Sequence, residues 1–151
     1  MSAAEADLPA ELSDAWSKLK RGGDARKLRN HLPALRRSVG GVTELESSLK
    51  EAFGGIGPDA VSPDSRASVR TTLVSSLQSH SLSIVGVLNV FSRLSSDAQG
   101  AVQSVLGWIA EHLVGILTAF AAHLGLQNWS VAAQLSSFPP GASFTITLTF
   151  I

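Results

Sequence analysis

Apolar residues recur at three- and four-residue intervals over most of this chain, which is the spacing of an amphipathic helix. The pattern is longest over two neighbouring segments, about 64–95 and 97–124. Ser62 followed by Pro63 is a typical helix start, and Gly125 stands where helix-ending glycines do. Because only a few residues separate the two segments, they are predicted to form a long antiparallel helical hairpin.

Shorter apolar stripes predict three short helices between residues 8 and 53. Thr43 and Glu46 have the spacing of a capping box, which predicts that the third helix begins there. Breaks in or between the helices are predicted at glycine pairs and a proline, namely Gly22–Gly23, Pro33, Gly40–Gly41 and Gly54–Gly55. The Gly- and Pro-rich segment 54–63 is predicted to be a loop that leads into the long hairpin.

The end of the chain changes from a period of 3.6 to a period of 2, which predicts strands. The predicted strands, 129–135 and 144–150, flank a segment containing Pro139 and Pro140, so they form a C-terminal β-hairpin. Its apolar face is predicted to pack on the helices, because a lone two-stranded hairpin is marginally stable. Alternatively, several copies would supply the strands of a membrane barrel. The uncharged second strand also favours pairing between copies. Its candidate self-association residues are Phe144, Ile146, Leu148 and Phe150.

Together these elements predict a mainly α-helical bundle that forms one domain, 1–151. The chain is of ordinary domain length, and 44% of its residues are hydrophobic, so it has enough apolar side chains for a core. The predicted parts are the short N-terminal helices (8–53), the loop (54–63), the long helical hairpin (64–125) and the β-hairpin (126–151).

Charge is distributed unevenly along the chain, although its net value is zero. Between Lys18 and Arg37 there are eight basic residues and one acid, Asp24. These candidate contacts with a membrane or another anion are Lys18, Lys20, Arg21, Arg26, Lys27, Arg29, Arg36 and Arg37. A basic amphipathic segment suits an anionic membrane surface, and a solvated helix face is the plain alternative. Nucleic acid is disfavoured as a partner, because the segment has no aromatic residue and no recognition motif.

From Ala98 to Ile151 the sequence has a single charged residue, Glu111. A solvated surface is normally rich in charge, so this region is predicted to be covered by the rest of the chain, by another copy or by lipid. Small residues follow one face of the second long helix at Gly107, Gly115 and Ala119. Tight packing inside the bundle is the preferred interpretation, and association with a neighbouring helix in a membrane is the alternative.

Two segments bear on targeting. Met1–Asp7 has two acids and no basic residue, so it does not match the start of a signal peptide. Val102–Leu124 is the best candidate for a membrane span, but Glu111 and His112 lie near its middle. The protein is therefore expected to be cytoplasmic, with contact to a membrane at its periphery.

The sequence gives little support for an enzyme or a metal site. It has no cysteine, no serine in a GxSxG context and no P-loop lysine. His80 and His112 would lie at the same level on opposite arms of the hairpin, with Glu111 beside one of them. Such a trio suits zinc. A core-edge histidine and a partly exposed one are the simpler interpretation, so no catalytic residue, metal or cofactor is predicted.

These patterns favour a non-enzymatic, self-associating helical protein that engages membranes and permeabilises them. The alternative is a soluble homo-oligomeric assembly or protein-interaction module, whose charge-poor surface is buried against identical copies or a protein partner. A third hypothesis is a carrier of an apolar ligand between the long helices, which requires a cavity.

Overall fold

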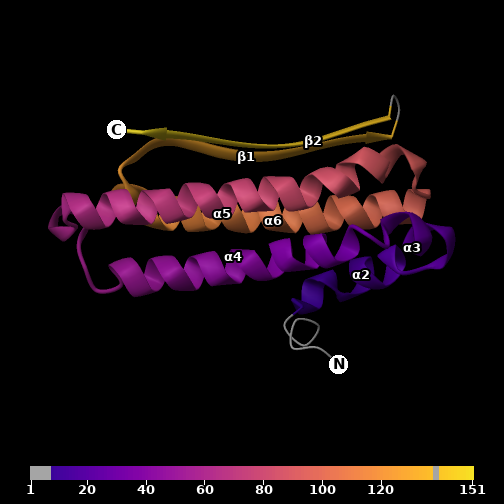
Figure 1. The fold of residues 1–151 in the computed structure, drawn as a ribbon, viewed down its shortest axis with the longest axis horizontal. Coiled ribbons are helices and arrows are strands. Elements are labelled where there is room, and N and C mark those ends of the chain that lie inside the picture. The colour runs from indigo at the N-terminus through magenta and orange to yellow at the C-terminus, as the bar shows by residue number, and fades with distance from the viewer. Residues whose placement is uncertain (1–7, 138–139) are drawn as a thin grey trace.

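Three layers make up the molecule in the computed structural model, which describes residues 8–137 and 140–151 (Figure 1). The middle layer is a pair of long antiparallel helices, α5 (Pro63–Val90) and α6 (Ser96–Leu124). A β-hairpin covers one side of this pair, and the N-terminal helices cover the other (Figure 1). The mainly helical fold, with its long helical hairpin and C-terminal β-hairpin, is as the sequence predicts.

Local signals set the ends of the long helices. The hydroxyl of Ser62 accepts a hydrogen bond of 3.1 Å from the N–H of Ser65, which caps α5. After α5, the 3₁₀ turn η3 (Phe91–Arg93) leads directly to Ser95, whose hydroxyl caps α6 by accepting from the N–H of Ala98 at 3.2 Å. This short connection returns the chain antiparallel to itself.

All four of the last carbonyls of α6 have partners. The N–H of Gly125, a residue with a φ of 69°, donates to the first two of them. Two arginines of α5 reach the others: Arg66 Nε donates to the carbonyl of His123 at 3.0 Å, and Arg70 Nε donates to the carbonyl of Leu124 at 2.6 Å. The positive guanidinium groups also suit the negative end of the α6 dipole. The two long helices are thus joined at this end by charge-assisted bonds.

The core lies between the layers and draws most heavily on α6. Burial of an apolar side chain contributes roughly 1.5–3 kcal/mol, so the core around α6 is the main source of stability. Eight large apolar side chains of α6 are at most 4% exposed: Val102, Val105, Leu106, Ile109, Leu113, Ile116, Leu117 and Leu124.

The N-terminal layer begins with η1 (Ala10–Leu12) and α2 (Ser13–Leu19), which pack on α6 through Trp16, 5% exposed. Two further helices follow, α3 (Gly22–Leu28) and α4 (Leu32–Phe53). As predicted, the chain divides near Pro33, which occupies the first turn of α4, and α4 ends before Gly54–Gly55. The 3₁₀ turn η2 (Pro58–Ala60) lies in the predicted loop.

Three predicted helix boundaries are wrong. Gly22–Gly23 begins α3 and does not end the first helix. Gly40–Gly41 does not stop a helix, and Thr43 and Glu46 do not form a capping box, because all four lie inside α4. The reason at Gly41 is a tertiary contact. A Cβ there would lie 3.0 Å from Cε1 of His80, so the missing side chain lets α5 approach α4.

The β-hairpin pairs β1 (Leu126–Ser137) with β2 (Pro140–Phe150), with an irregularity in register between Leu126 and Asn128. The strands are longer than predicted, because both ends of the expected loop 136–143 pair with each other and extend the two strands. Pro139 of that loop lies outside the described residues. The prediction that the apolar face packs on the helices is confirmed: half-buried residues on the core are Trp129, Val131, Ala133, Phe144, Ile146, Leu148 and Phe150.

Candidate functional site

The structure divides the eight predicted basic residues into two groups. Five are exposed on α3 and its flanks, namely Lys20, Arg21, Arg26, Lys27 and Arg29. The other three lie elsewhere. Lys18 Nζ is 3.3 Å from a carboxylate oxygen of Asp14. The Cζ atom of Arg36 lies 5.3 Å from the centre of the Trp16 ring. Arg37 lines a cavity between α4 and α5. We call residues 20–29 the basic end of the molecule.

The basic end holds the turn between α5 and α6. The carboxylate of Asp24 accepts two hydrogen bonds from Ser95, one from its backbone N–H at 2.9 Å and one from its hydroxyl at 2.6 Å. Lys27 Nζ donates to the carbonyl of Arg93 at 2.6 Å. The hydroxyl of Ser95, followed by its N–H, lowers the pKa of Asp24 below its ordinary value. We call this set of three bonds the α3 clasp.

Small and polar residues form most of the outer surface of the α5–α6 hairpin, on which Leu82 and Val85 are the exposed large apolar side chains. Both helices are long and apolar enough to cross a membrane, which by itself is weak support, because core helices of soluble proteins pass the same test. Core helices are mostly buried. Here only 28% of the most apolar 18-residue stretch of α5, and 44% of that of α6, is buried in the molecule.

The small-residue face of α6 points outward, so the preferred interpretation, packing inside the bundle, is wrong. Gly107, Gly115 and Ala119 are all exposed, and Glu111 lies among them on the same face. A Cβ on Gly107 or Gly115 would meet no atom within 4 Å. The inward direction is taken by the larger apolar residues, whose burial is worth more.

An apolar groove of about 550 Å³ runs between α5 and β2. Its walls include Leu77 and Leu82 from α5, and Ile146, Leu148 and Phe150 from β2. Leu82 is 75% exposed at its rim, an unusual position for a large apolar side chain. Three of the four predicted self-association residues of β2 therefore line a groove, while their strand packs on the core.

A buried polar pair lies between α4 and α5. Ser38 Oγ is 2.6 Å from His80 Nδ1, and each residue is 3% exposed. Burial lowers the pKa of His80, so its ring is neutral near pH 7. A cavity of about 330 Å³ adjoins the pair and is also lined by Arg37 and Glu44. Both members of the pair lie inside helices, away from the sharp turn that a serine nucleophile requires.

The histidines do not converge on a metal site. His80 lies against α4, whereas the ring of the exposed His112 stacks on Trp108 at 4.1 Å between centroids. Among residues 8–137 and 140–151, no three histidine or carboxylate side chains are placed to hold a metal ion. Trp108 in turn donates from Nε1 to Glu11 at 2.8 Å, and this bond lowers the pKa of Glu11.

Sequence reasoning missed the α3 clasp, although the sequence contains its signal. Asp24 is the one acid within the run from Lys18 to Arg37, which marks it as a residue with a specific partner. That the partner is Ser95, 71 positions away, follows only from the tertiary structure. Comparison with protein-family models, with curated proteins and with solved structures finds no match for this chain.

Proposed function

We propose that the protein is a non-enzymatic, self-associating helical protein that engages membranes through the α5–α6 hairpin and permeabilises them. The carrying observation is a pair of membrane-length helices, joined by a short turn, in each of which less than half of the most apolar 18-residue stretch is buried in the molecule. α5 and α6 extend about 42 and 44 Å, against about 30 Å for the hydrocarbon core of a bilayer.

The distribution of charge supports the proposal. From Thr71 to Ile151 the charged residues are Arg93, Asp97 and Glu111. Arg93 lies in the short connection between the helices and Asp97 in the first turn of α6, so an inserting hairpin would carry both charges at its tip. The N-terminal layer has the amphipathic character of a cover: α2 and α4 turn apolar residues toward the long helices and charged residues toward water.

The outer face of α6 supports the proposed self-association. A carboxylate near the middle of a bilayer costs about 2.5–3.5 kcal/mol on insertion scales, so Glu111 disfavours a lone hairpin in lipid. Gly107 and Gly115 flank it and allow another helix to approach closely. Copies that meet through this face would turn Glu111 toward one another and toward a water-filled path.

Membrane entry is tested with Trp108 as the single tryptophan, in a W16F/W129F background. We expect the protein to sediment with anionic vesicles, and brominated acyl chains to quench Trp108 on α6. Binding without quenching would limit the contact to the membrane surface. A protein that stays in the supernatant with anionic and neutral vesicles alike would refute the proposal.

Self-association is tested with Gly107→Leu and Gly115→Leu. Both positions are open, so the variants should fold, because almost any residue exceeds glycine in helix propensity. We expect them to bind vesicles as the wild type does, but to release trapped dye more slowly. Gly40→Leu is the matched control, since Gly40 is also exposed within a helix and also faces open space. Equal leakage by all three variants would contradict an assembly through the α6 face.

The second candidate, a soluble homo-oligomeric module, is favoured by the groove between α5 and β2. Leu82 of its wall is 75% exposed, and Val85, one turn further along α5, is 50% exposed. This hypothesis predicts a discrete oligomer by light scattering in the absence of lipid, which Leu82→Lys converts to monomer. A monomeric wild type in solution would leave membrane engagement as the remaining proposal.

A further inference from the structure

The α3 clasp attaches a helix that has few other contacts to the rest of the molecule. The helix has seven residues, begins with two glycines and has a single buried residue, Leu28. A helix this short is unstable by itself, so its position depends on its contacts. By contrast, α2 has the same length and buries Ala15, Trp16 and Leu19. Three polar bonds and the burial of Leu28 therefore hold α3 in place, and the polar bonds are the contacts that reach the α5–α6 turn.

All three bonds of the clasp are accessible to water and to ionic competitors. Lys27, Arg93 and Ser95 are exposed, and the bonds from Asp24 to Ser95 lie at the surface. The lysine of the clasp donates to a neutral carbonyl, although phosphate oxygens are stronger acceptors for an ammonium group. An anionic surface therefore attracts Lys27 away from its acceptor and repels the carboxylate of Asp24, and both effects weaken the same contact.

The neighbourhood of the clasp provides attraction to such a surface. The exposed basic residues of the basic end are each attracted to an anionic leaflet when they lie near its surface. Asp24, the one acid within residues 20–29, is engaged in the clasp, and Asp97 stands in the first turn of α6. The turn that α3 covers is also the tip at which the two apolar helices join.

We propose that the α3 clasp keeps the tip of the α5–α6 hairpin closed in solution, and that an anionic lipid surface opens it by displacing Lys27 and Asp24 from the turn. This regulation rests on the proposed membrane function. It assigns the basic end two coupled tasks, contact with anionic lipid and release of the hairpin that enters the bilayer.

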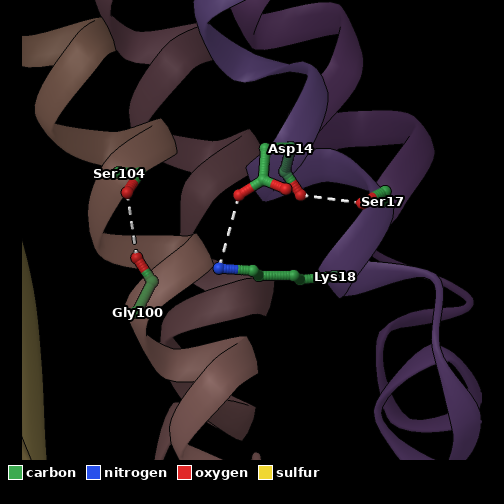
Figure 2. Close-up of polar contacts among 5 residues, drawn as sticks. All are labelled: Asp14, Ser17, Lys18, Gly100 and Ser104. Carbon is green, nitrogen blue, oxygen red and sulfur yellow. Dashed lines mark hydrogen bonds and ion pairs between the residues drawn. The ribbon is translucent and has the colours of Figure 1, made fainter.

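The first test compares Asp24→Ala with Asp14→Ala. Asp14 is a matched control, because it also lies in the first turn of a seven-residue helix and its removal changes the net charge equally. Figure 2 shows Asp14 with Lys18 on α2, beside the Gly100–Ser104 turn of α6. Hydrogen exchange of residues 91–98 without lipid should be roughly tenfold faster in Asp24→Ala, the change expected when charged hydrogen bonds are lost, and unchanged in Asp14→Ala. Equal exchange in the two variants would overturn the clasp.

The second test locks the clasp. The chain has no cysteine, so Asp24→Cys with Ser95→Cys gives one thiol pair, which a bis-methanethiosulfonate linker joins reversibly. We expect the linked protein to bind anionic vesicles as well as the reduced form does, but to release dye at least tenfold more slowly until a reductant restores it. Equal leakage before and after reduction would overturn the gating role, and Asp24→Ala should leak faster than Asp14→Ala.

The source of the anion is tested in parallel by exchange at residues 91–98 of the wild-type protein. Anionic vesicles should accelerate it, whereas neutral vesicles and inorganic phosphate at equal phosphate concentration should not. Acceleration by phosphate alone would overturn the need for a lipid surface. Failure of the wild type to bind anionic vesicles would overturn the lipid trigger together with the proposed function. Binding and leakage with no effect of the lock would overturn the clasp alone.

Discussion

Replacing Arg70 by methionine removes one group that joins α5, α6 and the β-hairpin. The guanidinium donates to the carbonyl of Leu124 at 2.6 Å and to that of Gly125 at 3.3 Å. Its Cζ atom also lies 4.6 Å from the centre of the Phe150 ring. Methionine has a similar length and preserves apolar contacts, so the variant loses the charge and the donors but little of the packing.

The expected loss follows from these three contacts. Hydrogen bonds from a charged donor contribute about 1.5–3 kcal/mol, a cation–π contact about 0.5–1 kcal/mol, and a cation at a helix C-terminus about 0.3–1 kcal/mol. Arg70 is half-buried and a single charge serves all three, so the contributions do not add fully. We expect the free energy of unfolding to fall by about 2–3 kcal/mol, which corresponds to roughly 4–12 °C in Tm for a chain of this size.

Urea unfolding followed by far-ultraviolet circular dichroism measures this change. Lys50→Met is the control, because it breaks an exposed ion pair of 3.1 Å with Glu46 and should lose no more than about 0.5 kcal/mol. Combining Arg70→Met with Phe150→Leu isolates the cation–π contribution as the coupling between the two substitutions. A loss in Arg70→Met no larger than that in Lys50→Met would refute the account of how α6 is capped.

Three further predictions concern the interface of α5 with its neighbours. Burial holds the pKa of His80 below its ordinary 6.5, so just below pH 6.5 the unfolded chain binds a proton that the folded chain excludes. The free energy of unfolding should therefore be constant above pH 6.5 and fall as the pH drops below it. The fall should be smaller in His80→Gln. A Cβ on Gly86 would collide with the His31 ring, so Gly86→Ala should lower Tm, and His31→Ala should restore part of the loss. Leu77→Ala, at a side chain 4% exposed, should cost about 2–5 kcal/mol in urea unfolding, whereas Leu82→Ala, at one 75% exposed, should change stability by less than about 0.5 kcal/mol.

The long elements could be predicted because their local signals agree with their tertiary roles. Ser62, Ser95 and Gly125 stand at helix ends, and the apolar period of α6 matches its buried face. The N-terminal boundaries were less predictable, because a glycine pair permits a helix end without requiring one. Inside α4, the space left by Gly41 accommodates His80, so a contact between distant residues overrides the local preference.

The candidate site was only partly predictable for a similar reason. The basic run and the charge-poor second half are properties of composition, and they are visible without coordinates. The small-residue face and the large apolar face of α6 both have helical spacing. The sequence alone therefore does not say which of the two is buried, and so which way Gly107 and Gly115 point. The role of Asp24 depends on a partner 71 residues away, for which the sequence alone gives no register.

The packing of α2 on α6 has a consequence for synthesis on the ribosome. α2 ends at Leu19 and α6 begins at Ser96, so the two partners of this contact are separated by about half of the chain. At about 5–20 residues per second, the apolar face of α2 waits roughly 4–15 s for α6 to be made. The N-terminal helices are therefore already made when α6 leaves the exit tunnel, so the more apolar of the two long helices emerges with its packing partner present.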